Sequence, residues 1–243
     1  MSARLAASGG QPRRAGRTAL RVVAIDGPSG VGKSTVARLL ATRLGVAYLD
    51  SGALYRAIAL QVLGAGVDPD DAAAVERLLE RTRLEIQSAP GADIEIRIDG
   101  ERVSEELRQP AVARAASRIA AQAAVRRRLT AVQRSAVPPA GAVVEGRDIG
   151  SVVFPETPHK FFLDARLEVR AQRRLRDIRR TRPEAELAEV VSEIGERDRR
   201  DRERSLSPLR LDDSYQVVDT SDLDADEVVR RIEDAVRRAC GLG

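Results

Sequence analysis

The 243-residue sequence contains very few of the side chains on which many enzymes rely. It has one cysteine, Cys240, and one histidine, His159. A disulfide framework or a cysteine-based metal site within one chain is therefore excluded, and a histidine-dependent triad is disfavoured. Tryptophan is absent and aromatic residues make up only 2% of the chain, which argues against a nucleic-acid platform of stacked rings. The core is expected to be aliphatic and rich in alanine.

Long apolar runs are also missing. No stretch approaches the ~18 residues that a membrane-spanning helix needs, and the apolar segment of a secretory signal is absent. Residues 1–19 carry several arginines and no acidic residue, so we expect a disordered basic tail, with an organelle transit peptide as the alternative. The sequence thus predicts a cytoplasmic protein that does not contact a membrane.

Lysine is rare in a chain that is otherwise rich in cations. Only Lys33 and Lys160 are lysines among 41 basic residues, and the rest are arginines. The formal net charge of +4 indicates anionic partners, either nucleic acid or phosphorylated small molecules. Acidic residues are interspersed with the basic ones, which favours small molecules.

Strands alternate with helices along most of the chain. A β-branched run over 20–26 leads through a Gly-rich turn into a helix over 34–44. The same alternation continues with strands over 46–49, 142–145, 160–164 and 215–218 and helices over 51–63, 110–123, 125–136 and 224–239. This pattern predicts an α/β fold with a mostly parallel central sheet flanked by helices.

Two helices allow finer predictions. The helix over 34–44 is expected to bury a single face, made of Val36, Leu39, Leu40 and Leu44. The last helix is expected to have Ser221 or Asp222 near its cap.

Two segments interrupt the alternation. Residues 67–109 are expected to begin with a helix from Asp68, and apolar and polar residues then alternate over 84–86 and 94–98. With the Asp99-Gly100 pair, this pattern predicts an antiparallel hairpin in a small inserted lobe. Residues 166–204 are helical and highly charged, with a break at Arg182-Pro183 and few apolar anchors. The remaining parts, 20–66, 110–165 and 205–243, would form the core domain.

A phosphate cradle follows the first strand. Residues 27–34 match the pattern G-x-x-x-x-G-K-[ST], in which glycines let backbone N–H groups surround phosphates at a helix N-terminus. Lys33 would reach the β- and γ-phosphates of ATP, and the Ser34 hydroxyl would bind Mg²⁺. The predicted nucleotide-binding residues are Gly27, Pro28, Ser29, Gly30, Val31, Gly32, Lys33, Ser34 and Thr35.

The cradle alone does not name a reaction. GTPases read guanine with an Asn-Lys-x-Asp motif, and this sequence contains no asparagine. Motor and transport ATPases are usually larger. Kinases that act on small molecules or nucleotides remain.

Three further segments are candidates for binding the acceptor. Residues 50–56 and 146–150 each follow a predicted buried strand, where ligands bind in doubly wound sheets. Residues 197–204 lie in the charged stretch. The structural alternatives are a capped helix start, a polar loop and a solvated, salt-bridged helix face, respectively.

Together these segments resemble the bacterial cytidylate kinases, P-loop nucleoside monophosphate kinases. The resemblance extends over nearly the whole chain beyond the tail, and the stretch Gly146-Arg-Asp-Ile-Gly-Ser-Val-Val-Phe-Pro155 is its most specific part. It implies transfer of a phosphoryl group from ATP to CMP or dCMP. It also implies that 67–109 bind the monophosphate and that 166–204 form a mobile lid.

The resemblance also implies roles for individual residues. Ser104, Arg126 and Asp148 fall near the cytosine edge, and Arg197 and Asp201 fall near the sugar. The acceptor phosphate would lie near Arg56, Arg147 and Arg204, with Ser51 also contacting the substrate. Lys33, Arg147 and Arg204 would be catalytic.

Some assignments stay open at this point. Arg170, Arg173 and Arg174 could meet the triphosphate or form packing and salt-bridge contacts, and Tyr55 is expected to pack so that it orients Arg56. The acceptor could instead be UMP, AMP or a non-nucleotide, and an ATP-binding, RNA-associated module is the alternative of another class. We expect a monomer whose partners are nucleotides, without specific nucleic-acid binding.

Overall fold

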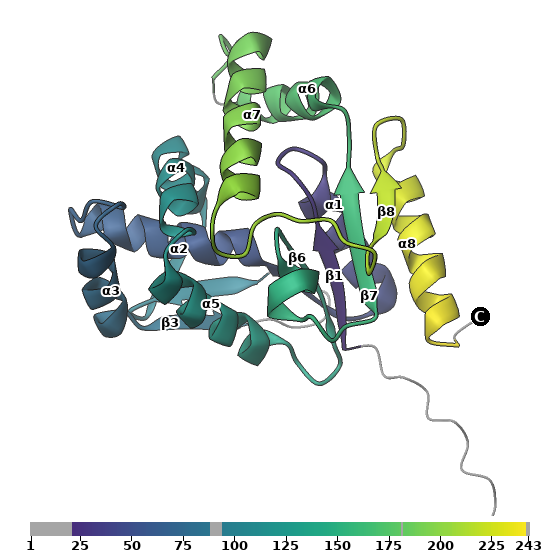
Figure 1. Ribbon diagram of the computed structural model, residues 1–243, viewed down its shortest axis with the longest axis horizontal. Coiled ribbons are helices and arrows are strands. Elements are labelled where there is room, and N and C mark those ends of the chain that lie inside the picture. The colour runs from purple at the N-terminus through teal and green to yellow at the C-terminus, as the bar shows by residue number, and fades with distance from the viewer. Residues whose placement is uncertain (1–20, 88–93, 181, 242–243) are drawn as a thin grey trace, which may run out of the picture.

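The computed structural model describes residues 21–87, 94–180 and 182–241, so the predicted basic tail lies outside the described part of the chain. Its central sheet has five strands in the order β2-β6-β1-β7-β8 (Figure 1). The strands are β1 (Val22–Asp26), β2 (Ala47–Asp50), β6 (Ala142–Gly146), β7 (His159–Asp164) and β8 (Gln216–Asp219). Every pairing in this sheet is parallel, which confirms the predicted α/β architecture.

Helices cover both faces of the central sheet. On one face, α1 (Lys33–Leu44) and α8 (Ala225–Ala239) enclose an aliphatic core with β1 and β7. The other face packs against Ile149, Val153 and Phe154 after β6 and against Ala136 at the end of α5 (Ala123–Ala136). Helices α2 (Ser51–Gly64), α4 (Pro110–Ile119) and α5 contribute to a further apolar cluster. The core contains mainly Val, Ile, Leu and Ala, as the composition predicted.

A separate antiparallel sheet lies in the segment for which the sequence predicted a hairpin. It consists of β3 (Leu84–Gln87), β4 (Glu95–Ile98) and β5 (Glu101–Val103), and it is preceded by α3 (Ala72–Arg81). Asp99 and Gly100 make the β4–β5 turn with φ angles of 52° and 89°, which confirms the predicted tight turn. A 3₁₀ turn, η1 (Glu105–Arg108), then leads into α4.

The charged segment folds into two helices, α6 (Leu167–Ile178) and α7 (Leu187–Glu203), separated at the predicted break (Figure 1). These helices are better anchored than their charge suggested, because they enclose a small apolar cluster of their own. Its buried members are Ala171, Leu175, Ala185, Val190 and Ile194. The expectation of few apolar anchors was therefore wrong.

Two finer expectations also need correction. Leu39 is 37% exposed, because α1 buries Val36, Ala37, Leu40 and Ala41 instead. The N-cap of α8 is Asp224, whose carboxylate accepts a hydrogen bond from the Glu227 N–H while Glu227 bonds back to the Asp224 N–H. Ser221 and Asp222 bind Arg166 at the start of α6.

Candidate active site

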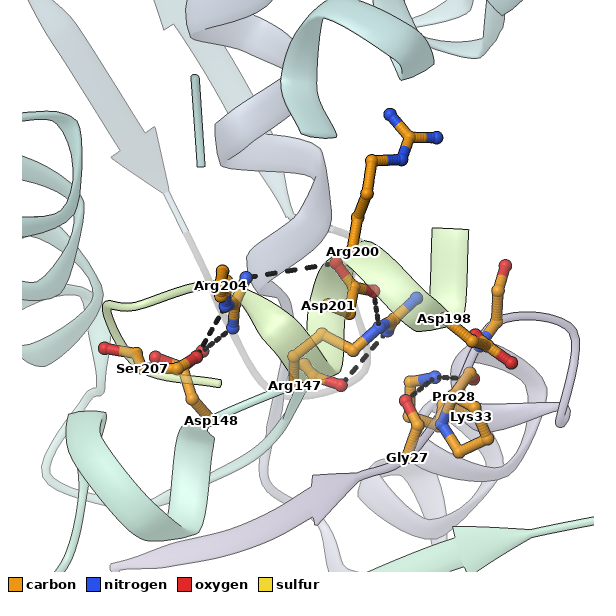
Figure 2. A network of polar contacts seen from close by, with 12 residues as sticks. Gly27, Pro28, Lys33, Arg147, Asp148, Asp198, Arg200, Asp201, Arg204 and Ser207 are labelled. Atoms are coloured by element: carbon orange, nitrogen blue, oxygen red, sulfur yellow. Dashed lines mark hydrogen bonds and ion pairs between the residues drawn. The ribbon is translucent and has the colours of Figure 1, made fainter. Parts of the chain in front are cut away.

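The segments expected to bind ligands follow the carboxyl ends of three neighbouring strands. β1 ends at Asp26 before the phosphate cradle, β2 ends at Asp50 before α2, and β6 ends at Gly146. Because β2, β6 and β1 are adjacent and parallel, these ends lie at one edge of the sheet. The segment around α7 approaches the same edge (Figure 2).

The cradle over 27–34 has the backbone geometry that phosphate binding requires. Gly27, Gly30 and Gly32 have φ angles of 149°, 77° and 97°, which L side chains rarely adopt. A Cβ atom at Gly27 would also lie 2.2 Å from the Leu163 carbonyl oxygen on β7. Gly32, which carries no side chain, is the N-cap of α1, so the first N–H groups of this helix can face an anion.

Lys33 is buried at the start of α1. Its ammonium group donates hydrogen bonds to the carbonyl oxygens of Gly27 at 2.8 Å and Pro28 at 2.7 Å (Figure 2). Burial, followed by the positive charge of Arg147, lowers the pKa of Lys33 to about 7. The lysine therefore lies beside the cradle as a cation that a nearby anion would stabilise.

Glu145 is a buried carboxylate that the sequence analysis missed. It hydrogen-bonds the Ser34 hydroxyl and accepts a hydrogen bond from the Tyr48 phenol at 2.7 Å. Burial, and then the negative charge of Asp50, raises the pKa of Glu145. Its signal in the sequence was an acidic residue at the end of a predicted buried strand.

The oxygen atoms of Ser34 and Glu145 suit a hard divalent cation, because Mg²⁺ prefers hydroxyl, carboxylate and water ligands. Ser34 and Thr35 are both exposed at the N-terminus of α1. The donor set beside the cradle therefore fits the predicted Mg²⁺.

A cluster of arginines surrounds Asp148. The Arg126 guanidinium forms an ion pair with the Asp148 carboxylate, and both side chains are almost fully buried. Arg126 also donates to the Ser207 hydroxyl at 2.9 Å, and a nitrogen of Arg204 lies 3.8 Å from the Asp148 carboxylate. The structure thus brings Arg126, Asp148 and Arg204 together.

Ser104 is placed differently. It is exposed at the N-terminus of η1, where its N–H donates to the Glu106 carboxylate. Among the described residues, no hydrogen bond joins Ser104 to Arg126 or Asp148. The structure therefore brings Arg126 and Asp148 together without Ser104, and the assignment of all three to the cytosine edge stays a prediction.

Arg147 connects the Asp148 cluster to α7. Its guanidinium donates to the Asp201 carboxylate at 2.9 Å, and Arg204 approaches the other oxygen of Asp201 at 4.0 Å (Figure 2). Burial, and then the charge of Arg147, lowers the pKa of Arg197 to about 10. Ion pairs thus connect five of the predicted substrate-binding residues: Arg126, Arg147, Asp148, Asp201 and Arg204.

Two buried guanidinium nitrogens in this cluster lack a hydrogen-bond partner among the described residues. They are Arg197 Nε and one terminal nitrogen of Arg204. Leaving buried donors unsatisfied is costly, so such donors in a cluster of arginines indicate a site for an anion. The two arginines come from positions that the resemblance assigned to sugar and phosphate.

The segment over 50–56 forms the start of α2. Asp50 caps this helix by accepting from the Ala53 N–H at 3.0 Å, and its other oxygen binds Arg56 at 2.8 Å. Ser51 is buried beneath Gly146, where a Cβ atom would lie 2.6 Å from the Ser51 hydroxyl. The structural alternative, a capped helix start, is therefore confirmed, and the cap residue also orients Arg56; binding of the acceptor by this segment stays a prediction.

Tyr55 has a different partner from the one expected. Its ring lies under the guanidinium of Arg126, with 5.8 Å between the guanidinium carbon and the ring centre. Tyr55 thus orients Arg126 by a cation–π contact and does not pair with Arg56.

The three arginines left open on α6 have separate roles. Arg170 is buried, pairs with Asp198 of α7 and donates to the Ser29 carbonyl at 3.0 Å. Arg173 instead binds the Thr220 hydroxyl and carbonyl, and Arg174 is exposed. Arg170 thus contacts the phosphate cradle, and Arg173 also reaches it through a long hydrogen bond to the Val31 carbonyl at 3.5 Å.

Asp198 is a second residue that the sequence analysis missed. Its carboxylate accepts from the Ser29 N–H at 3.0 Å, and it is 2% exposed. The signal was weak, because Asp198 is one of many charges on α7. Its contact ties α7 directly to the cradle.

Other features lie outside the site. His159 and Cys240 are buried with 3.5 Å between their side chains, and burial lowers the pKa of His159. The described residues contain no cluster of three or more His, Cys, Asp or Glu side chains suited to a metal ion. Within the same residues, no helix has both the length and the apolar character to cross a membrane.

Comparison with known proteins agrees with this geometry. The family model described as cytidylate kinase matches residues 23–238. A cytidylate kinase of Symbiobacterium thermophilum is 45% identical over 218 residues, which are 89% of this chain and 96% of that protein. A cytidylate kinase of Nocardia farcinica is 45% identical over 224 residues, with 91% and 96% covered. The match spans the cradle, the Asp148 cluster, α6 and α7, and the chain belongs to the cytidylate kinase family.

Proposed function

We propose that this protein transfers the γ-phosphoryl group of ATP to CMP or dCMP, giving ADP and CDP or dCDP. The observation that carries the proposal is the pair of anion sites at one sheet edge, the cradle over 27–34 and the arginine cluster around Asp148. Arg147 lies between them, near enough to Lys33 to influence its pKa. Donor and acceptor phosphates would therefore meet beside Arg147.

The donor site would hold ATP through residues 27–35. The backbone N–H groups of the cradle and the N-terminus of α1 bind the phosphates, and Lys33 turns from the Gly27 and Pro28 carbonyls toward the β- and γ-phosphates. Mg²⁺, held through Ser34 with Glu145 behind it, would neutralise charge on the triphosphate. Tyr48 keeps the Glu145 carboxylate in place.

The acceptor site would hold the monophosphate through arginine. Arg56, Arg147 and Arg204 would bind its phosphate by planar, paired hydrogen bonds. Arg197 and Asp201 would lie beside the sugar, with Asp201 held by Arg147. Asp148 would accept a hydrogen bond from the cytosine amino group, while Ser104 would join Arg126 at the base as the lobe closes.

The reaction needs no protein base. A phosphate oxygen of CMP attacks the γ-phosphorus, and the bond to the leaving oxygen of ADP breaks. The acceptor phosphate is already largely dianionic at pH 7, because its second pKa is about 6. Lys33, Arg147 and Arg204 would stabilise the charge that develops during transfer.

The predicted division of the chain fits this reaction. Residues 67–109 would bind the monophosphate, and 166–204 would form a lid over a core made of 20–66, 110–165 and 205–243. The protein would act as a monomer in the cytoplasm, with nucleotides as its partners and no specific nucleic acid.

An ADP-release assay tests the proposal. Purified protein is supplied with ATP, Mg²⁺ and one acceptor at a time: CMP, dCMP, UMP or AMP. The proposal expects the highest kcat/KM with CMP or dCMP. Faster turnover with UMP or AMP would reassign the acceptor, and a salt-sensitive complex with RNA without turnover would favour the RNA-associated alternative.

A further inference from the structure

A buried group of hydrogen bonds lies beneath the segment that carries Arg147 and Asp148. At its centre is Asp26, the last residue of β1, whose side chain is fully buried. Its two carboxylate oxygens accept from the backbone N–H groups of Ile149 at 2.9 Å and Gly150 at 2.8 Å. The Tyr215 hydroxyl donates to the same carboxylate at 2.8 Å.

These contacts fix the backbone next to Asp148. Asp148 is the N-cap of the short helical segment η2 (Ile149–Val153), and Asp26 binds the first two N–H groups of that segment. A buried carboxylate is costly unless it is well hydrogen-bonded, and three donors offset part of that cost here. Burial still raises the pKa of Asp26 to about 6.

Tyr215 comes from a distant part of the chain, just before β8. Its ring packs edge-to-face against Phe162, with 6.1 Å between the ring centres, so the hydroxyl is held in one direction. Gly150 admits that hydroxyl, because a Cβ atom there would lie only 2.8 Å from it. The contact thus depends on four separate segments of the core, which carry Asp26, Gly150, Phe162 and Tyr215.

We propose that Asp26 and Tyr215 are positioning residues for the acceptor site: they set the orientation of Arg147 and Asp148, and hence acceptor affinity and base selectivity, without touching substrate. The inference rests on the proposed CMP kinase function. The competing explanation is that Asp26 only supports the phosphate cradle, because Gly27 follows it directly. The two explanations differ in which substrate the loss of the contact affects.

Tyr215→Phe is the mildest test, because it removes one hydroxyl and keeps the ring against Phe162. Loss of this hydrogen bond lets the segment after Asp148 move, and we expect the KM for CMP to rise about 3- to 10-fold. The KM for ATP should change less than about twofold. The CMP/UMP ratio of kcat/KM should fall. Asp26→Asn, which places an amide donor against backbone donors, should have a larger effect in the same direction.

Thr157→Val provides the matched control. Thr157 is buried, and its hydroxyl donates a hydrogen bond to the Val22 carbonyl at 2.6 Å. Val22 is the first residue of β1, so this contact stabilises the end of β1 opposite to Asp26. The substitution should lower the Tm while leaving both KM values and the selectivity ratio unchanged.

The measurement is steady-state kinetics with CMP, UMP and ATP varied in turn, for wild type and the three variants. If Tyr215→Phe only lowers the Tm, as Thr157→Val does, the role is structural and the inference is overturned. An equal rise in the KM for ATP also overturns it, in favour of cradle support. Failure of the wild type to phosphorylate CMP would instead remove the proposed function itself.

Discussion

At the scale of single residues, we expect phosphate binding to depend most on Lys33. It is one of two lysines in the chain, and its side chain is buried. Among the hydrogen bonds of the described residues, its ammonium group donates only to carbonyl oxygens of the cradle. Lysine supplies a compact charge that can rotate from these carbonyls onto a phosphate, whereas the planar arginine fork is less able to do so.

Replacing Lys33 with Met should therefore remove the charge while keeping much of the side-chain volume. We expect kcat to fall by about 10²–10³, the effect of losing one group that stabilises transition-state charge. Stopped-time assays at saturating ATP and CMP measure it, with circular dichroism as the check on folding. A folded variant with nearly normal kcat would contradict the role of Lys33.

The lowered pKa of Lys33 makes ATP binding depend on pH. Above its pKa of about 7 the free protein holds Lys33 largely neutral, and the phosphates of ATP would raise that pKa by favouring the charged form. ATP binding at pH 8 should then take up a proton, and ATP affinity should decrease as pH rises above about 7.

Calorimetry of ATP binding at pH 8, in two buffers with different ionisation enthalpies, measures that uptake. Lys33→Arg serves as the control, because arginine stays protonated and should take up none. Equal proton uptake in the wild type and in Lys33→Arg would show that another group is responsible.

Asp148 allows a prediction about base selectivity. It pairs with Arg126 and lies near Arg204, while Arg147 binds Asp201, so Asp148 does not tie down the loop through Arg147. The cytosine amino group donates to a carboxylate, whereas uracil presents a carbonyl at that position.

Asp148→Asn should therefore lower kcat/KM for CMP much more than for UMP, by about tenfold or more in the ratio. The comparison uses wild type and variant at saturating ATP and Mg²⁺. An unchanged CMP/UMP ratio with both activities reduced would mean that Asp148 does not read the base.

At the scale of elements, α1 buries only one face, so two adjacent leucines differ in their exposure to solvent. Leu40 is fully buried against the sheet and α8, while Leu39 is 37% exposed. Leu40→Ala should destabilise the protein by about 2–5 kcal/mol because it leaves a cavity. Leu39→Ala should change stability by about 0.5 kcal/mol or less. Urea unfolding of both variants tests the assignment, and similar losses would contradict it.

Helices α6 and α7 are joined to the cradle by one buried ion pair. Arg170 of α6 and Asp198 of α7 bind each other and also bind the carbonyl and the N–H of Ser29. Removing one partner of a buried pair leaves an uncompensated charge, which is strongly destabilising. These contacts connect any movement of α7 to the loop that would hold the triphosphate.

At the scale of the whole molecule, we predict that 166–204 close over the site when both nucleotides bind. Binding would supply anions to Arg197 Nε and to one terminal nitrogen of Arg204, which have no hydrogen-bond partner among the described residues. Closure would exclude water and so limit wasteful hydrolysis of ATP.

Hydrogen exchange with and without a bisubstrate analogue measures this closure. Amides of α7 should become more protected on binding, while those of α8, which packs in the core, should stay nearly unchanged. Equal protection of α7 in both states would argue against a lid.

Much of the architecture could be predicted because it depends on local rules. The parallel sheet follows from alternating strands and helices, and the β4–β5 hairpin follows from Asp99-Gly100, a pair that tolerates positive φ. The cradle is equally local, since its glycines, its lysine and the helix after it are consecutive. The buried residues of α1 were harder to predict, because helical spacing alone places Leu39 near the buried face and does not show on which side of the helix the sheet lies.

The sequence by itself determined that this chain cradles phosphates and belongs with the kinases, since consecutive residues carry those features. Only the tertiary structure decided the pairing of charges, because each long arginine has many possible acidic partners and topology selects one. In the folded chain Arg126 pairs with Asp148 and lies over the Tyr55 ring, and Arg147 pairs with Asp201. Asp198 accepts a hydrogen bond from the Ser29 N–H. The tertiary structure likewise brought Tyr215 to Asp26 across 189 positions of sequence, a contact no local pattern could indicate.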